Sequence, residues 1–143
     1  MGVACTCGVE VNAFSASNNV KFTGQTGTTK GDLTYLADVC VNSLETSTLS
    51  LHFQDTETGA NTFTFTANAI TSVTCKKEGQ NCVVTVVGTG LVNGTQFSFK
   101  AVFRDQVATA AKDNVQSFVI TGFFDQNGAA PVPQGSIVAV GCQ

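Results

Sequence analysis

The chain has 143 residues, of which 43% are hydrophobic and only 12% are charged, and its formal net charge is −3. This length suits one compact domain, since domains cluster near roughly 100–150 residues. Its seven lysines and arginines are scattered along the chain and form no basic stripe, and no apolar run approaches the roughly 20 residues of a membrane-spanning helix. We therefore expect neither nucleic acid nor an inserted membrane as a partner.

The first sixteen residues differ from the rest of the chain. They contain two cysteines, no turn-forming pair and, as their only charged residue, Glu10. This pattern is typical of an extended arm, and we predict an arm (connector) over residues 1–16 followed by a single β-domain over residues 17–143. The alternative is an ordinary first strand with a frayed tip.

Apolar and polar residues alternate with period two along most of the chain, which predicts β-strands. The clearest strands place on one face Leu49, Leu51 and Phe53, then Phe63, Phe65 and Ala67, and then Phe97, Phe99, Ala101 and Phe103. Further strands are expected over residues 20–23, 33–41, 70–75, 82–92, 116–124 and 136–142, which are rich in β-branched and aromatic side chains. The alanine-rich segment 107–113 is expected to form either a helical turn or a loop.

Glycine and asparagine pairs separate these strands, and Asn93-Gly94 is the strongest hairpin signal. Short strands at regular spacing with such turns are typical of two-sheet proteins. We therefore predict an all-β fold, an antiparallel β-sandwich or jelly roll of about nine strands with the extended arm before it.

Cys75 and Cys82 flank a polar segment, Lys76 to Asn81, that reads as a hairpin loop. Directly opposite residues of an antiparallel pair have Cα atoms about 5.5 Å apart or less, within reach of a disulfide. We predict an intramolecular Cys75–Cys82 bond. The alternative is a reduced pair on opposite faces of the sheet.

Cys5 and Cys7 point the same way in an extended segment, which disfavours a bond between them. Their remaining candidate partners are Cys40 and Cys142. Either the arm folds back on its own domain, or it reaches into a neighbouring molecule. Four thiolates could also hold zinc, but the spacing lacks the paired C-x2–4-C pattern of structural zinc sites.

Common signatures of hydrolysis and nucleotide binding are absent from the sequence, and we predict no catalytic residue, cofactor or metal. The single histidine, His52, lies on the polar face of its strand, and nothing links it to a cysteine. An enzyme with an unrecognised site is a remote alternative. A monomeric adhesion or carbohydrate-binding module is the main rival, with Tyr35 as the natural candidate for stacking on a sugar.

Six cysteines in a small chain indicate an oxidising compartment, whereas the N-terminus lacks the pattern of a secretory signal. Release of the protein by lysis of a mother cell, which would leave it on a spore, reconciles the two observations. We expect an extracellular or spore-surface protein.

Two resemblances bear on function. Residues from Cys82 onward, with Val86-Val87-Gly88-Thr89-Gly90 and Phe97-Ser98-Phe99-Lys100-Ala101-Val102-Phe103, resemble a β-sandwich module of surface proteins of spore-forming bacteria. The overall plan, a cysteine-bearing arm before one β-domain, is similar to that of the subunits of bacterial endospore appendages (spore pili). This chain departs from that family at Thr6, which separates Cys5 from Cys7, whereas the connector cysteines of the family are adjacent.

The second resemblance implies a jelly-roll subunit that stacks by β-strand augmentation and is locked by disulfides between subunits. Cys5 and Cys7 would be the connector cysteines, and Cys40 and Cys142 the intermolecular acceptors. The expected function is a structural subunit that self-assembles into an extracellular or spore-surface fibre. Its main partner would be itself, with a surface or glycan ligand as a further partner. Few charged residues on the strands also suit edge pairing.

Overall fold

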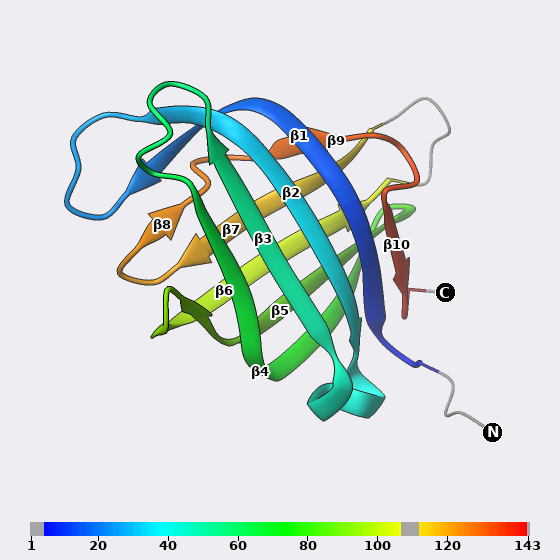
Figure 1. The fold of residues 1–143 in the computed structure, drawn as a ribbon. Coiled ribbons are helices and arrows are strands. Elements are labelled where there is room, and N and C mark those ends of the chain that lie inside the picture. The colour runs from blue at the N-terminus through cyan, green and yellow to red at the C-terminus, as the bar shows by residue number, and fades with distance from the viewer. Residues whose placement is uncertain (1–4, 107–111, 143) are drawn as a thin grey trace.

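A computed structural model describes residues 5–106 and 112–142 (Figure 1). Residues 1–4 of the predicted arm, and residues 107–111 of the predicted helical turn or loop, lie outside the described residues. The described residues form ten strands and one 3-10 helix. These are β1 (Gly8–Phe22), β2 (Thr29–Cys40), η1 (Val41–Thr46), β3 (Thr48–Asp55), β4 (Phe63–Glu78), β5 (Asn81–Val92), β6 (Thr95–Asp105), β7 (Asp113–Ile120), β8 (Phe124–Asp125), β9 (Ala130–Val132) and β10 (Ile137–Val140).

The strands form one antiparallel sheet that closes on itself. Each strand from β1 to β7 pairs with the next one in the chain, and the short β8 pairs with both β7 and β1. β10 adds to β1 and β9 adds to β7. In Figure 1, β1 to β4 cross in front of β5 to β7. The all-β, antiparallel prediction is confirmed, but the sandwich or jelly roll is corrected to an eight-stranded closed barrel with two extra strands.

Bends in long strands explain why a barrel forms. β4 has register shifts at Ala67/Ala69 and at Ile70/Ser72, and such bulges increase the local bend and twist of a strand. Across from them, a Cβ atom at Gly90 would overlap the ring of Phe65, so glycine permits the close approach there. The bent strand passes from the front of the barrel to the back without a break in the sheet.

The predicted N-terminal arm is wrong for the residues that the structure describes from Gly8 onward. β1 pairs with β2 from Gly8↔Cys40 to Val20↔Thr29, and Val9, Val11 and Ala13 are buried in the core. The predicted boundary between residues 16 and 17 therefore falls inside β1. The alternative prediction, an ordinary first strand, agrees with the structure. The strand resembles an arm in sequence because most of its outward residues are uncharged.

Aromatic side chains fill the barrel. The predicted inward residues of three strands, among them Phe53, Phe65 and Phe103, are each at most 1% exposed. Phe65 packs edge-to-face on Phe99 with ring centroids 5.2 Å apart. Deep in this core, the Tyr35 hydroxyl donates a hydrogen bond to Gln126, and burial raises the pKa of the Tyr35 phenol. The interior is a packed core.

Candidate functional site

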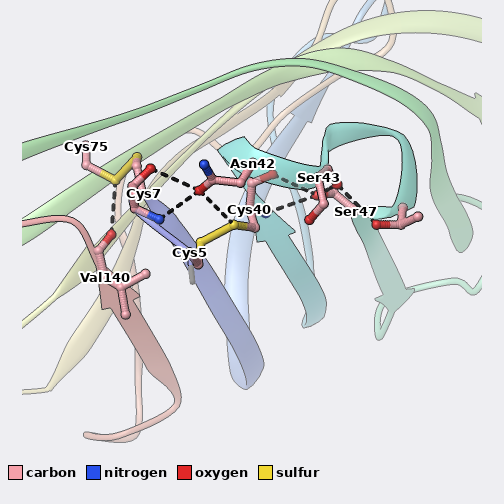
Figure 2. The surroundings of a disulfide bond; sticks show 10 residues. Cys5, Cys7, Cys40, Asn42, Ser43, Ser47, Cys75 and Val140 are labelled. Atoms are coloured by element: carbon pink, nitrogen blue, oxygen red, sulfur yellow. Dashed lines mark hydrogen bonds between the residues drawn. A yellow bond between two sulfur atoms is a disulfide. The ribbon is translucent and has the colours of Figure 1, made fainter. Parts of the chain in front are cut away.

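The six cysteines form three disulfide bonds at one end of the barrel. The bonds join Cys5 to Cys40, Cys7 to Cys75 and Cys82 to Cys142. Figure 2 shows the first two beside each other, where β1 begins and β2 ends. The bonds span 35, 68 and 60 residues of sequence, so each one ties together distant parts of the chain.

The predicted bond between Cys75 and Cys82 is wrong because the hairpin turn is tighter than expected. β4 continues to Glu78 and β5 starts at Asn81. The register sets Cys75 opposite Val84 and Cys82 opposite Lys77. The two cysteines are therefore diagonal neighbours, a spacing of about 7–8 Å, which exceeds the Cα separation that a disulfide usually spans.

The predicted intermolecular cysteines, Cys5, Cys7, Cys40 and Cys142, all bond within the chain. The start of the described chain thus folds back on its own domain. Asn42 Oδ1 fixes it there by accepting hydrogen bonds from the Thr6 N–H (2.8 Å) and hydroxyl (2.9 Å). No cysteine among residues 5–106 and 112–142 is free, which also overturns the zinc alternative.

Two carboxylates close the outer edge of β10. The side chain of Asp113 is fully buried and accepts hydrogen bonds from the N–H groups of Gly135 (2.9 Å) and Ile137 (3.0 Å). Asp105 accepts one from Ala139 (2.9 Å). Burial raises the pKa of Asp105, although the Ala139 N–H opposes this effect. An edge whose amide groups are already bonded offers few donors to an added strand, so strand augmentation is disfavoured here.

A groove of about 640 Å³ runs over the outer face of β1 to β4 and β10. We call it the front groove, and its outward side chains include Glu10, Asn12, Leu36, Asp38, Ser50, Thr66 and Val138. Leu36 and Val138 are 50% and 51% exposed, and Phe14, diagonal to Leu36 across β1 and β2, is 51% exposed. Exposed apolar side chains gathered on one face are typical of an interaction site.

Two unpaired acidic residues lie in the same groove. Glu10 of β1 is directly opposite Asp38 of β2, and both side chains are exposed. Like charges in this position destabilise a sheet. The ion pairs within the described residues are those of Glu78 with Arg104 (2.8 Å) and Lys76 (4.0 Å). The front groove therefore presents negative charge beside apolar surface and would favour a partner with the opposite charge.

The opposite face of the barrel carries the complementary arrangement. Lys100 of β6 is exposed and lies between Val87 of β5 and Val119 of β7 in the ladder. Both valines are half-buried. We call these three residues the back face. It presents a positive charge between apolar side chains.

Two further residues singled out in the sequence have structural roles. Tyr35 is 1% exposed, so it cannot stack on a sugar, and the interpretation of Tyr35 as a glycan-binding residue is wrong. His52 lies on the outer face, as predicted, and its Nδ1 is 2.8 Å from the Thr64 hydroxyl. Among the described residues, no three His, Cys, Asp or Glu side chains gather closely enough to hold a metal ion.

The buried carboxylate of Asp55 organises the loop between β3 and β4. It accepts hydrogen bonds from the N–H groups of Glu57 (2.9 Å), Thr58 (3.1 Å) and Asn61 (3.1 Å), and from the Thr58 hydroxyl (3.0 Å). Burial raises the pKa of Asp55, but these hydrogen bonds outweigh burial and hold the pKa well below its usual range. The loop is therefore built around an ionised carboxylate.

Replacing Asp55 by Asn should make the protein less stable at neutral pH and flatten its response to acid. A lowered folded-state pKa contributes stability that is present above the unfolded-state value of about 3.9 and is lost as the pH falls toward the folded-state value. Urea denaturation at a series of pH values measures this. Curves of equal slope for the wild type and D55N below about pH 4 would contradict this role for Asp55.

Sequence reasoning missed the front groove, although strand parity carries a signal for it. Val9, Val11 and Ala13 alternate with Glu10, Asn12 and Phe14, so Phe14 shares the outward face with two polar residues. A large aromatic residue at the polar parity of a strand marks an exposed apolar position. That Leu36 and Val138 lie on the same face required the pairing of β1 with both β2 and β10.

Comparison of the chain with protein-family models, curated protein sequences and solved structures finds no match. Within the described residues, no helix has the length and apolar character needed to cross a membrane. Three intramolecular disulfides are compatible with an extracellular or secreted protein.

Proposed function

We propose that the protein is a structural, non-catalytic subunit that assembles with further copies of itself into an extracellular fibre. The front groove of one copy would receive the back face of the next. One observation carries the proposal: Glu10 and Asp38 lie unpaired beside Leu36 and Val138 in the groove, while Lys100 lies between two valines on the other side of the barrel.

This pairing leads to a fibre because the two surfaces differ. A contact between unlike surfaces leaves a free groove at one end of the assembly and a free back face at the other. Such head-to-tail contacts form a ring where the rotation closes and a filament where it does not. The low fraction of charged residues, 12%, limits repulsion between copies that are packed closely.

The contact proposed here uses faces rather than strand edges or intermolecular disulfides. The N–H groups of Ile137 and Ala139 on the β10 edge are held by carboxylates, and the six cysteines are paired within the chain. We therefore expect the fibre to be non-covalent. Its place on a spore surface is what the resemblance to endospore appendage subunits implies.

A non-catalytic role is supported by how the concave surfaces are distributed. The barrel interior is filled with aromatic side chains, and the front groove is open to solvent along the outside of the sheet. Enzyme sites more often lie in clefts that bury most of the ligand surface.

Charge reversal tests the assembly. Wild-type protein should form concentration-dependent oligomers in sedimentation velocity and filaments in negative-stain electron microscopy. Replacing both Glu10 and Asp38 by Lys, or replacing Lys100 by Glu, should each weaken association more than about tenfold, because like charges brought together across an interface cost several kcal/mol. Mixing the two variants should restore assembly, since each groove then meets an oppositely charged back face.

The matched control for K100E is Lys30→Glu, which makes the same change in net charge. Lys30 is exposed and lies at the start of β2, whereas Asp38 of the front groove lies near the end of that strand. The Lys30→Glu variant should leave association unchanged. A wild-type protein that stays monomeric at every concentration would contradict the proposal. So would a mixture of the two reversed variants that fails to associate.

A further inference from the structure

A small pocket opens at the barrel end away from the disulfides. It has a volume of about 200 Å³ and shares no lining residue with the front groove. The loop after β1, the loop before β4, the β5–β6 turn and the turn before β8 contribute its walls. Its lining includes Thr23, Gln25, Asn61, Asn93, Phe63 and Phe123. We call it the mouth pocket.

Its polar groups are held in place by the fold. The Thr23 N–H donates to the Phe123 carbonyl (3.0 Å), and Gln25 Nε2 donates to Asn61 Oδ1 (3.0 Å). Asn61 is fixed in turn by the Asp55 carboxylate, which accepts its backbone N–H. Asn93 has a φ of 50° in the tight β5–β6 turn. The pocket is thus largely formed before any ligand arrives, and this reduces the entropic cost of binding.

The floor of the pocket is aromatic. Phe63 and Phe123 meet edge-to-face with ring centroids 4.9 Å apart, and Phe123 is tilted against Phe97 at 5.3 Å. Phe123 is half-buried, so part of its surface faces the opening. An aromatic floor of this kind packs against an apolar face of a ligand.

The lining carries no charged residue. Its polar side chains are amides and hydroxyls, and within the described residues the side chains of Thr23 and Asn93 make no hydrogen bond. Amides and hydroxyls can both donate and accept hydrogen bonds, which matches a ligand with several hydroxyl groups and no net charge. The volume lies below the roughly 300–1,000 Å³ of pockets for drug-sized ligands, so it suits a single ring.

We propose that the mouth pocket binds one unit of an uncharged saccharide, with the sugar's apolar face on Phe123 and its hydroxyls on Thr23 and Asn93. A site of this kind would let the protein attach to a glycan-bearing surface. The proposal does not rest on fibre assembly, because the pocket and the front groove have separate linings.

The test is a two-dimensional NMR titration of the full chain with methyl β-glucoside, methyl β-galactoside, methyl α-mannoside and N-acetylglucosamine, with glucuronate as the charged comparison. At least one neutral sugar should shift the backbone amide signals of Thr23, Asn61 and Asn93, with a Kd in the millimolar range. Glucuronate should shift them less. The absence of shifts with all four neutral sugars, or equal shifts with glucuronate, would overturn the proposal.

Two variants assign the site. Asn93→Gly removes the amide and tolerates the positive φ, while Thr23→Val removes the hydroxyl with little change of shape. Each should weaken sugar binding between about two- and tenfold, as expected for one ordinary hydrogen bond. The matched control is Asn127→Gly, a second asparagine at positive φ (65°) that lies outside the pocket. Equal affinities of all three variants and the wild type would place any binding elsewhere and overturn the assignment.

Discussion

Replacing Asp113 by Ala should lower the free energy of unfolding by about 4 kcal/mol or more. The side chain is 0% exposed, and its carboxylate accepts hydrogen bonds from the N–H groups of Gln106 (2.8 Å), Gly135 (2.9 Å) and Ile137 (3.0 Å). Hydrogen bonds to charged groups contribute about 1.5–3 kcal/mol each, and buried donors without a partner cost about 1–3 kcal/mol. Urea denaturation with the disulfides intact measures the loss.

The loss should be localised at β10 before the whole barrel unfolds. Hydrogen exchange of the Ile137 amide should accelerate strongly in D113A, because its acceptor is removed, whereas amides in the β5–β6 ladder should keep more of their protection. The control is Asp38→Asn, an exposed carboxylate opposite Glu10, which should not destabilise the protein. A D113A variant as stable as D38N would show that the buried carboxylate does not hold β10.

Local features of the fold could be predicted from the sequence because they depend on neighbouring residues. Period-two alternation identified Leu51, Phe53 and Phe65 as core residues, and all three are fully buried. The Asn93-Gly94 hairpin is confirmed as well, since β5 ends at Val92 and β6 begins at Thr95 with both turn residues at positive φ. These signals survive because strand pleat and turn conformation are set within a few residues.

Closure of the barrel could not be predicted in the same way. A strand alternates identically whether its inner face meets a second sheet or the far wall of the same barrel. The deciding features are the bulges in β4 and the pairing of the two-residue β8 with Lys21 and Phe22. Neither feature can be recognised from period-two alternation. A bulge interrupts the alternation of β4, and β8 has too few residues to show an alternation.

The disulfide pairing was also predicted wrongly, because it depends on strand register and on contacts between distant parts of the chain. The polarity of Lys76 and Lys77 suggested a loop, but both are exposed residues of β4, which extends beyond them in the hairpin. Cys75 bonds to Cys7 and Cys82 bonds to Cys142. These partners lie near opposite ends of the chain, and β1 and β10 bring them to the disulfide-bonded end of the barrel. Parity placed Cys5 and Cys7 correctly as residues that do not bond to each other.

The grouping of residues on the outer face of the barrel could not be predicted from the sequence either. Phe14, Leu36 and Val138 come from β1, β2 and β10, and the strand register places them on the same outer face. The same holds for Lys100 between Val87 and Val119. The surfaces that we propose for assembly thus follow from strand order, while the core follows from alternation.

Replacing Cys7 and Cys75 together by Ala should lower the free energy of unfolding by about 4 kcal/mol, the chain-entropy estimate for a loop of this length. The bond spans 68 residues, compared with 35 for Cys5–Cys40. The matched double variant C5A/C40A should therefore lose roughly 0.6 kcal/mol less, since loop entropy grows only with the logarithm of length. Denaturation of both variants in the absence of reductant measures this difference.

Peptide mapping under non-reducing conditions tests whether Cys75 is bonded to a cysteine near the N-terminus or to Cys82. Trypsin cleaves after Lys76 and Lys77, between Cys75 and Cys82, so the two cysteines fall in separate peptides. The structure predicts that peptide 1–21 is joined to 31–76, and peptide 78–100 to 113–143. A linkage of 31–76 to 78–100 would instead contradict the Cys82–Cys142 bond and would agree with a Cys75–Cys82 bond. The predicted linkages in a protein that also runs as a monomer on a non-reducing gel would establish that the disulfides stabilise each subunit, so that charge and apolar contact must supply any assembly.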